Sequence, residues 1–354
     1  VGIAPGDTVY VGESNNTVVF SGNNDGAHVV SAVTNTTLTV STDLTTETVA
    51  DAYFSGAYQY GLYFTTGSTD AVIEDSTFTD LGFDAWFVVG TGHTFRRNTI
   101  SDSEGWDMCH FGGANHIFSF NTFKNGLLAT GGAYSPSPDV FENLTTGIVY
   151  SNILFEYNLV DSFDGVFMVQ KGSGVGTGLT IRNNIFRDVG RMNLTHPNTV
   201  IQNNTFIRVA KTSSILRSRV DDPIYVNEAG GATNVVVRNN IFYDCGEPTG
   251  SDTTANVGWY EVVGSSTFTA SNNFASSVSP TYAAKTGWPE GNATLNGGDP
   301  NFVNLSDPLG ADNLPFTTDD GLKLNAGSKL INTGFNGVDE IGAHTFVASG
   351  NTYY

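Results

Sequence analysis

The chain has few charged residues. Only 14% of its 354 residues are Asp, Glu, Lys or Arg, against about 25% in a typical globular domain. It contains 15 Lys or Arg and 35 Asp or Glu, so its formal net charge is −20 at pH 7. Such an excess of negative charge makes nucleic acids and anionic membrane surfaces poor partners. We therefore expect no nucleic-acid partner.

Long apolar runs are also missing. The chain has no run of about 18 apolar residues, so we expect no membrane insertion. The two cysteines, Cys109 and Cys245, lie far apart in the sequence, and we expect buried free thiols rather than a disulfide. Abundant Gly (41 residues), Thr, Ser and Asn are typical of short strands joined by tight turns.

A short phrase recurs eight times: Asn (once Ser), any residue, then Phe, Ile or Val. The first two intervals are 22 and 23 residues, and later ones range from 20 to 37. Such a period is too short for a helical hairpin but suits one coil of a β-solenoid. We expect the Asn to occupy the same turn in each coil, where it tolerates left-handed geometry, and the third residue to point inward. The phrases begin at Ser76, Asn98, Asn121, Asn158, Asn184, Asn204, Asn240 and Asn272.

The repeat predicts an all-β protein, a single right-handed parallel β-helix of about ten coils. Residues 1–51 contain short alternating stretches, which we interpret as a strand-rich capping segment. The β-helix is expected over residues 52–300. Residues 301–354 are expected to form an irregular tail packed on the solenoid, because they resemble the C-terminal ending of many secreted right-handed parallel β-helix proteins.

Positive charge is concentrated in one part of the chain. Eight of the 15 cations lie between residues 171 and 219, where Asp188 is the only acid. Stacked coils lie roughly 4.8 Å apart, so several of these cations could form one patch that binds carboxylates or sulfates. The alternative is that they are solvated or balance acids in neighbouring segments. The eight residues are Lys171, Arg182, Arg187, Arg191, Arg208, Lys211, Arg217 and Arg219.

Residues 161–206 contain four short phrases in sequence: Gln170-Lys171-Gly172, Asn184-Ile185-Phe186, Thr195-His196-Pro197 and Asn204-Thr205-Phe206. This stretch resembles polysaccharide lyase family 6, the β-helical alginate and chondroitin/dermatan lyases. By this resemblance Lys171 matches the catalytic base and Asp164 a calcium-binding acid. Two positions depart from the family: Thr195 stands where it has a catalytic Arg, and Val166 where it has a second calcium-binding acid.

The resemblance implies an extracellular lyase for an acidic, uronate-containing polysaccharide, with Ca²⁺ as a cofactor, or a polysaccharide-binding relative that has lost catalysis and in which Lys171 is a binding cation. β-Elimination requires a neutralised uronate carboxylate, removal of the adjacent proton and protonation of the leaving oxygen. We predict catalysis by Lys171, Arg191 and Arg217. The predicted metal ligands are Asp164 and Asp161. The predicted substrate-binding residues are Arg187, Arg219, Lys211, His196, Trp86 and Trp106.

A column of acids follows the repeated phrases and offers another chemistry. The acids of this column are Asp80, Asp102, Asp161, Asp188 and Asp244, and Asp84, Asp107 and Asp164 follow a few residues further on in their coils. Stacked carboxylates suit calcium or the carboxyl pair of a glycoside hydrolase, although Asp after a turn also bonds local backbone. The acidic segment Asp307–Asp320 is a candidate structural calcium loop. Residues His110, His116 and His196 show no zinc-site spacing with Cys109.

A function from a different class is also consistent with the sequence. A non-catalytic adhesin or virion appendage, similar to a tailspike, would use the same β-helix. Trimerisation would favour that alternative, whereas a monomer with calcium-dependent turnover would favour the enzyme. Both hypotheses place the protein outside the cell, either secreted or on a virion surface.

Overall fold

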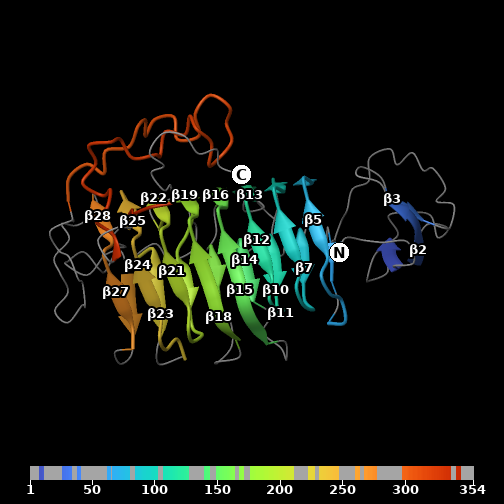
Figure 1. Cartoon of the computed structure of the whole chain (residues 1–354). Coiled ribbons are helices and arrows are strands. Elements are labelled where there is room, and N and C mark those ends of the chain that lie inside the picture. The colour runs from blue at the N-terminus through green and yellow to red at the C-terminus, as the bar shows by residue number, and fades with distance from the viewer. Residues whose placement is uncertain are drawn as a thin grey trace, which may run out of the picture.

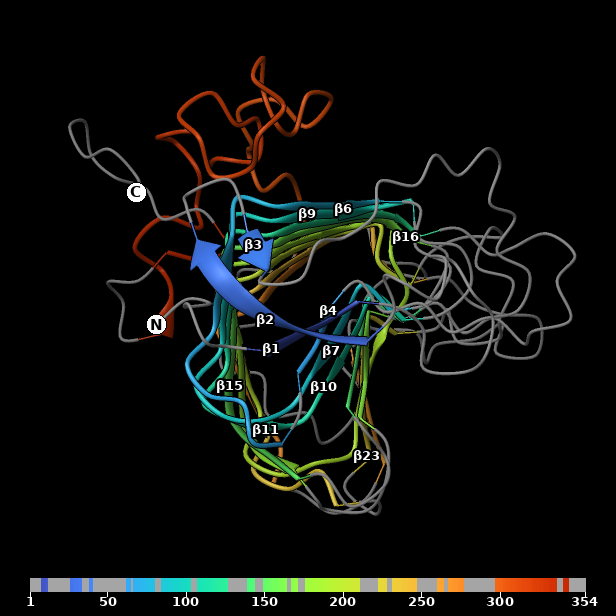
Figure 2. The ribbon, with the colours of Figure 1, turned by 90° about the vertical axis from the view of Figure 1, so that its right-hand side faces the viewer.

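Three parallel β-sheets dominate the structure, which is a computed structural model (Figure 1). Seen along the coil axis, the sheets form the sides of a solenoid (Figure 2). Among the described residues, no helix is long and apolar enough to span a membrane. The described residues are 8–11, 26–33, 38–40, 62–64, 66–79, 84–102, 107–126, 139–143, 149–163, 167–170, 176–210, 222–227, 231–246, 260–263, 267–276, 297–335 and 340–343.

Each coil contributes one short strand to each sheet. The first sheet contains β4 (Leu62–Tyr63), β7 (Trp86–Val88), β10 (Cys109–Phe111), β14 (Phe141–Asn143), β17 (Met168–Val169), β20 (Met192–Leu194), β23 (Ile224–Asn227) and β26 (Tyr260–Val263). The second contains β5 (Val72–Glu74), β8 (Thr94–Arg96), β12 (Ile117–Ser119), β15 (Tyr150–Glu156), β18 (Gly176–Arg182), β21 (Val200–Gln202), β24 (Val236–Arg238) and β27 (Thr269–Ser271), with β11 (Gly113–Ala114) paired to β15. The third contains β6 (Thr77–Thr79), β9 (Thr99–Ser101), β13 (Thr122–Gly126), β16 (Leu159–Phe163), β19 (Ile185–Arg187), β22 (Thr205–Ile207), β25 (Ile241–Tyr243) and β28 (Phe274–Ser276).

The parallel β-helix predicted from the repeat is confirmed. The first and third sheets each have eight strands within the described residues, where the sequence predicted about ten coils. The N-terminal strands β1 (Thr8–Val11), β2 (Gly26–Val33) and β3 (Leu38–Val40) form a separate antiparallel sheet. The capping role of that sheet stays a prediction, and so do the predicted boundaries of the three segments of the chain.

The recurring Asn residues form a buried ladder at the corner that precedes the third sheet. Asn184 Oδ1 accepts the backbone N–H of Asn158 at 2.8 Å. Its Nδ2 donates to Phe155 O at 2.9 Å, one coil back, and to Asn204 Oδ1 at 3.0 Å, one coil forward. Each Asn thus satisfies backbone groups that a corner would otherwise leave unpaired. The ladder runs through Asn98, Asn121, Asn158, Asn184, Asn204, Asn240 and Asn273.

Two details of the ladder differ from the prediction. The last Asn is Asn273 and not Asn272, because β28 pairs Phe274 with Ile241. The left-handed residue is the one before each ladder Asn, as at Asn183, whose φ is 56°. Asn272 itself has φ 53°, so the doubled Asn provides both features in one coil.

The third residue of each phrase except the last fills the core, as predicted. The rings of Phe186, Phe206 and Phe242 stack through three coils, with centroids 4.9 Å and 4.6 Å apart. In the last coil Ala275 takes this inward position and Phe274 points outward. Both cysteines are buried and free, which confirms that prediction.

Part of the C-terminal segment covers the outer face of the third sheet, as the red chain above β16 to β28 shows (Figure 1). Outward residues such as Ile185 and Ile241 pack with Phe302, Phe316 and Leu330 of that segment. Backbone contacts fix its end, since Thr205 Oγ1 accepts the Ala343 N–H at 2.9 Å. The outer face of the third sheet is therefore covered from β16 to β28, whereas residues 297–335 show no such packing against the outer face of the first sheet among the described residues.

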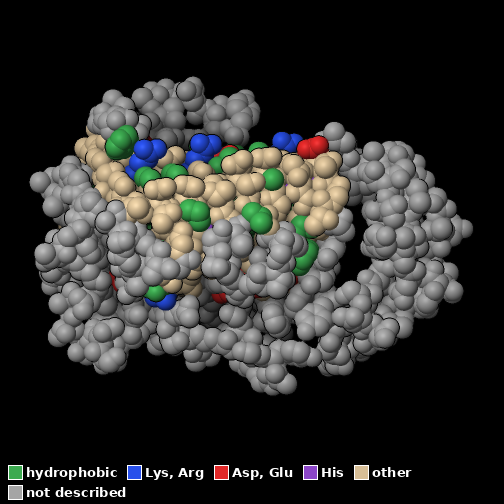
Figure 3. All heavy atoms as spheres, turned by 90° about the horizontal axis from the view of Figure 1, so that it is seen from below, with side chains coloured by type: hydrophobic (Ala, Val, Ile, Leu, Met, Phe, Trp, Pro, Cys, Tyr) green, Lys and Arg blue, Asp and Glu red, His purple; other side chains and the backbone are tan. Residues whose placement is uncertain are grey.

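The described part of the surface seen from below carries few charged side chains (Figure 3). Uncharged polar side chains and backbone make up most of its described part, and Lys, Arg, Asp and Glu appear at a few places only. Acidic side chains are instead concentrated elsewhere on the solenoid.

Candidate functional site

Three buried acids stack at the start of neighbouring strands in the first sheet. Asp84, Asp107 and Asp139 each lie two residues before β7, β10 and β14 respectively. The register pairs Cys109 with Trp86 on one side and with Phe141 on the other, so the three Asp residues occupy equivalent positions. The stacking of Asp84 and Asp107 agrees with the acidic column seen in the sequence.

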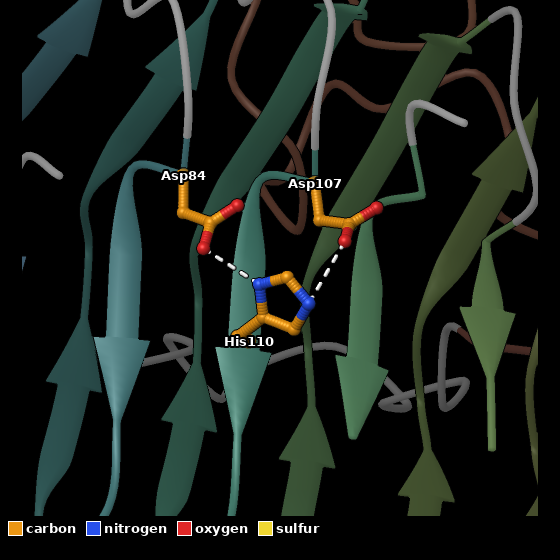
Figure 4. Close-up of side chains that lie close together, drawn as sticks. All are labelled: Asp84, Asp107 and His110. Atoms are coloured by element: carbon orange, nitrogen blue, oxygen red, sulfur yellow. Dashed lines mark hydrogen bonds and ion pairs between the residues drawn. The ribbon is translucent and has the colours of Figure 1, made fainter. Parts of the chain in front are cut away.

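His110 lies at the centre of these acids, on the outward side of β10 (Figure 4). Its Nδ1 lies 2.6 Å from Asp84 Oδ2, and its Nε2 lies 3.0 Å from Asp107 Oδ2. The neighbouring outward residue on β14 is Glu142, whose Oε1 lies 3.4 Å from Nε2. We call Asp84, Asp107, His110, Asp139 and Glu142 the His110 cluster.

Burial and charge together shape the protonation of the cluster. Burial would lower the pKa of His110, but its hydrogen bonds to Asp107, Asp84 and Glu142 outweigh this and raise the pKa to about 12. His110 is therefore an imidazolium at neutral pH. Burial raises the pKa of Asp84 to about 6 despite the opposing hydrogen bond to His110, and burial also raises the pKa of Asp107.

The two stacked acids next to His110 differ in their hydrogen bonds. Asp107 Oδ1 accepts the backbone N–H of Asp139, one coil forward, at 2.9 Å. The corresponding oxygen of Asp84, Oδ1, is buried and has no hydrogen-bond partner among the residues that the structure describes. Its other oxygen is held by His110. Asp84 thus presents one oxygen that the fold does not use.

The arrangement suits two kinds of chemistry. A carboxyl with a pKa near 6, beside further carboxyls in a different environment, is the set of groups that general acid–base catalysis uses. The ligand atoms of Asp84, Asp107 and His110 lie within 4.8 Å of one another, and so do those of Asp107, Asp139 and Glu142. Groups at such distances can share a proton or bind one cation.

Several residues predicted from the sequence lie outside the described residues. The roles proposed for them stay predictions. They are Lys171, Lys211, Arg217, Arg219, Trp106 and Asp164.

The basic cluster does not form an anion-binding patch at the described arginines. Arg187 Nε donates to Asp161 Oδ1 at 2.7 Å, and a second guanidinium nitrogen contacts Asp161 Oδ2. Arg187 and Asp161 thus neutralise each other, and this pairing supports neither the substrate role of Arg187 nor the calcium role of Asp161. Both roles stay predictions. Arg182 and Arg208 pair in the same way with acids of the preceding coil, which is the alternative that balances charge locally.

Two predicted substrate-binding residues are buried, and those predictions were wrong. Trp86 is 0% exposed, and its ring lies 4.6 Å from Phe95 inside the solenoid. The outward residue of β7 is Phe87, which pairs with His110. His196 is 0% exposed and its Nδ1 lies 3.1 Å from Tyr150 Oη, within the interior. Neither side chain can contact a sugar.

Arg191 directly precedes β20 of the first sheet, and the contacts that it makes within the described residues do not include the His110 cluster. Its Nε donates to Asn193 Oδ1 at 2.8 Å, and its guanidinium lies 4.5 Å from the centre of the Tyr225 ring. It precedes β20, which is separated from β14 by β17. Its catalytic role stays a prediction.

Sequence reasoning missed His110, Asp139 and Glu142. The interval from Asp84 to Asp107 is 23 residues, the same as one interval of the Asn ladder, so the two acids could have been placed in register. The search for zinc-like His and Cys pairs, however, passed over a His surrounded by carboxylates. Asp139 follows at 32 residues, after a longer segment that hides its equivalence.

Comparison with known proteins supports the fold. Residues 38–206 match the family model described as the right handed beta helix region. No curated protein matches the chain. A solved structure, a mutant of the PL6 family alginate lyase AlyGC, aligns at 11% identity with a TM-score of 0.18. The alignment covers 82% of this chain and 58% of that one, so the chain spans little more than half the length of that lyase. The three parallel sheets and the family match show that the chain folds as a right-handed parallel β-helix.

Proposed function

We propose that the protein cleaves a polysaccharide at the outer face of the first sheet, with the His110 cluster as its reaction centre. One observation carries the proposal: several buried carboxyls surround one imidazolium on an outward-facing strand. The His110 side chain is 12% exposed, whereas that of Asp84 is 0% exposed. His110 is therefore the point at which the cluster meets the surface.

Glycoside hydrolysis is the reaction that these groups suit best. It requires a carboxylic acid that protonates the leaving oxygen and a carboxylate that activates water or meets the developing positive charge. Asp84 is our candidate proton source because burial raises its pKa to about 6. Its side chain is fully buried, so the proton would reach the sugar through the His110 ring, which is bonded to Asp84 and is the exposed member of the cluster. Asp107 and Glu142, on the other side of the His110 ring, are candidates for the carboxylate.

β-Elimination of an acidic, uronate-containing polysaccharide is our second candidate. The observation in its favour is the position of Lys171 in the chain, one residue after Gln170. Gln170 is bonded to the first sheet, since its N–H donates to Asn193 O at 3.0 Å. A Lys base near that sheet would act on the same outer face.

The test is an assay on neutral and acidic polysaccharides with two readouts, new reducing ends and the ultraviolet absorbance of unsaturated uronates. We expect Asp84→Asn to lower kcat by roughly 100-fold or more, the usual contribution of a general acid, with little change in KM. Asp312→Asn, in the C-terminal segment, is the matched control and should keep full activity. Circular dichroism confirms that both variants fold.

Other results would point elsewhere. An absorbance signal that Lys171→Ala abolishes and Asp84→Asn retains would replace hydrolysis by the lyase reaction. Polysaccharide retained on the protein without any cleavage would support the non-catalytic adhesin instead.

A further inference from the structure

We propose that residues 340–343 form a latch that holds the C-terminal segment on the solenoid, and that the latch opens when the side chain of Glu340 loses its proton. The latch packs on the outer face of the third sheet, whereas the proposed reaction centre lies on the first sheet. Opening of the latch is therefore measured without any assay of polysaccharide cleavage.

Three consecutive backbone N–H groups of the latch donate hydrogen bonds. One bond goes to the C-terminal segment, and two go to neighbouring coils of the solenoid. The three bonds are Ile341 N–H to Leu330 O at 3.2 Å, Gly342 N–H to Asn239 O at 2.9 Å and Ala343 N–H to Thr205 Oγ1 at 2.9 Å. The latch is thus bonded to the segment and to the solenoid at once.

A second row of Asn side chains, outside the buried ladder, also binds the latch. These residues are the left-handed positions that precede the ladder Asn residues. Asn203 Nδ2 donates to Glu340 O at 2.7 Å, and Asn183 Nδ2 donates to Ala343 O at 3.3 Å. Amide groups do not titrate, so these contacts are the same at every pH. Glu340 is the one residue of the latch whose side chain can change its charge.

The latch fits closely against the sheet. Ile341 is 0% exposed and Ala343 is 1% exposed. Gly342 has φ 109°, and a Cβ atom on it would lie 2.6 Å from Ile241 Cδ1 and 3.2 Å from Thr205 Oγ1. A residue with a side chain would therefore hold the latch away from the third sheet. Because the contact is this close, a charge that forms within it is poorly hydrated.

The carboxyl group of Glu340 is placed where such a charge is costly. The residue is 8% exposed, and its Oε2 is buried without a hydrogen-bond partner among the described residues. A carboxylate at this place loses its hydration and gains no compensating bond, whereas the protonated acid carries no charge. Burial accordingly raises the pKa of Glu340 from 4.5 to about 7.

Among the described residues, no ion pair compensates Glu340. The cations on the elements packed against the latch have other partners, and the phenols of Tyr157 and Tyr243 lie in the same apolar cluster. Asp339 precedes Glu340 in the chain and lies outside the described residues. The cations are Arg182, paired with Glu156, Arg187, paired with Asp161, Arg208, paired with Asp188, Arg238, bonded to Gln202, and Lys329, bonded to Gly297 O.

The direction of the effect follows from the raised pKa of Glu340. The closed latch holds the proton more tightly than an open one, in which Glu340 is hydrated. Protonation therefore stabilises the closed latch fully below about pH 4.5, and this stabilisation is lost as the pH rises to about 7. Acid keeps the latch closed, and a neutral or alkaline medium favours its opening.

The experiment is amide hydrogen exchange of the whole chain between pH 5 and pH 8, followed by mass spectrometry and corrected for the intrinsic pH dependence of exchange. In the natural chain, the protection of the amides of residues 341–343 should fall by roughly 50- to 100-fold over this range. Glu340→Gln has nearly the same shape and no charge, so its protection should stay constant. Asn203→Ala removes the donor to Glu340 O and should lower protection equally at every pH.

Three results would overturn the proposal. Constant protection in the natural chain would mean that Glu340 ionises while the latch stays closed. The same decline in Glu340→Gln as in the natural chain would assign the effect to another group. An equal decline in the amides of residues 184–186, within the buried ladder, would show that the solenoid opens as a whole and not at the latch.

Discussion

Asn184→Ala should lower the free energy of unfolding by about 3–5 kcal/mol, because each buried polar group left without a partner costs about 1–3 kcal/mol. Truncation removes the acceptor of the Asn158 N–H and the donors to Phe155 O and Asn204 Oδ1. Asn184 is 0% exposed, so water cannot replace these bonds. The loss also interrupts the ladder between its N-terminal and C-terminal halves.

Urea denaturation followed by circular dichroism measures the effect. The matched control is Asn304→Ala, in the C-terminal segment, where an exposed Asn accepts the Ser306 N–H locally at 3.2 Å. Surface changes of this kind cost less than about 1 kcal/mol. Equal losses in the two variants would show that the ladder contributes no more than an ordinary surface bond. A biphasic transition in Asn184→Ala would show that the coils on either side unfold separately.

The ladder could be predicted from sequence because its chemistry repeats. Each coil needs a side chain at the same corner that both donates and accepts a hydrogen bond. The short Asn side chain does both and has little conformational freedom. The phrase therefore recurs despite intervals that vary from 20 to 37 residues. In the last coil the phrase misled the prediction, since Asn272-Asn273-Phe274 fits it whereas Asn273-Phe274-Ala275 ends in Ala, and the strand register places Asn273 in the ladder.

The candidate site could be predicted only in part, because it depends on which coils are neighbours and which side chains face outward. Trp86 and Phe87 are adjacent, and a shift of one residue in the expected strand exchanges their faces. The prediction of an anion-binding patch, which rested on the number of cations in residues 171–219, failed for a related reason. The acid that pairs with Arg187 is Asp161, one coil earlier, and it falls outside the stretch in which the cations were counted. Residues that lie side by side in neighbouring coils can therefore be far apart in the sequence.

Acid should destabilise the protein through a second stack, formed by His93 and His116. Their rings lie 5.0 Å apart and are parallel within 3°. His116 Nδ1 accepts the His93 N–H at 3.1 Å, and His93 Nδ1 accepts the Ala71 N–H at 3.0 Å. The proton of each ring must therefore be on Nε2, which faces the carbonyl of Val89 in His93 and that of Gly112 in His116. A second proton on Nδ1 would remove the acceptor from a buried backbone N–H.

The direction of the effect follows from the pKa. Burial and the neighbouring His93 lower the pKa of His116 from 6.5 to about 4. The unfolded chain therefore takes up a proton at a higher pH than the folded chain does. The stabilisation from neutral His116 is complete above pH 6.5 and is lost as the pH falls from 6.5 to about 4. At about 1.4 kcal/mol per pKa unit, the loss amounts to roughly 3 kcal/mol.

Comparison with His116→Asn isolates this contribution, because Asp84, whose pKa is raised to about 6, stabilises the folded state in the opposite direction as the pH falls. An Asn side chain can accept the His93 N–H through Oδ1, as the ladder Asn residues do, and it does not titrate. We expect the free energy of unfolding to fall between about pH 7 and pH 4.5 by about 2–3 kcal/mol more in the natural chain than in His116→Asn. Parallel curves for the two proteins would mean that the folded state accepts the proton without loss, so that His116 is not a neutral acceptor in the stack. A difference confined to this pH range would show that neutral imidazole stabilises the corner between the first and second sheets. At the corner before the third sheet, Asn has the corresponding role.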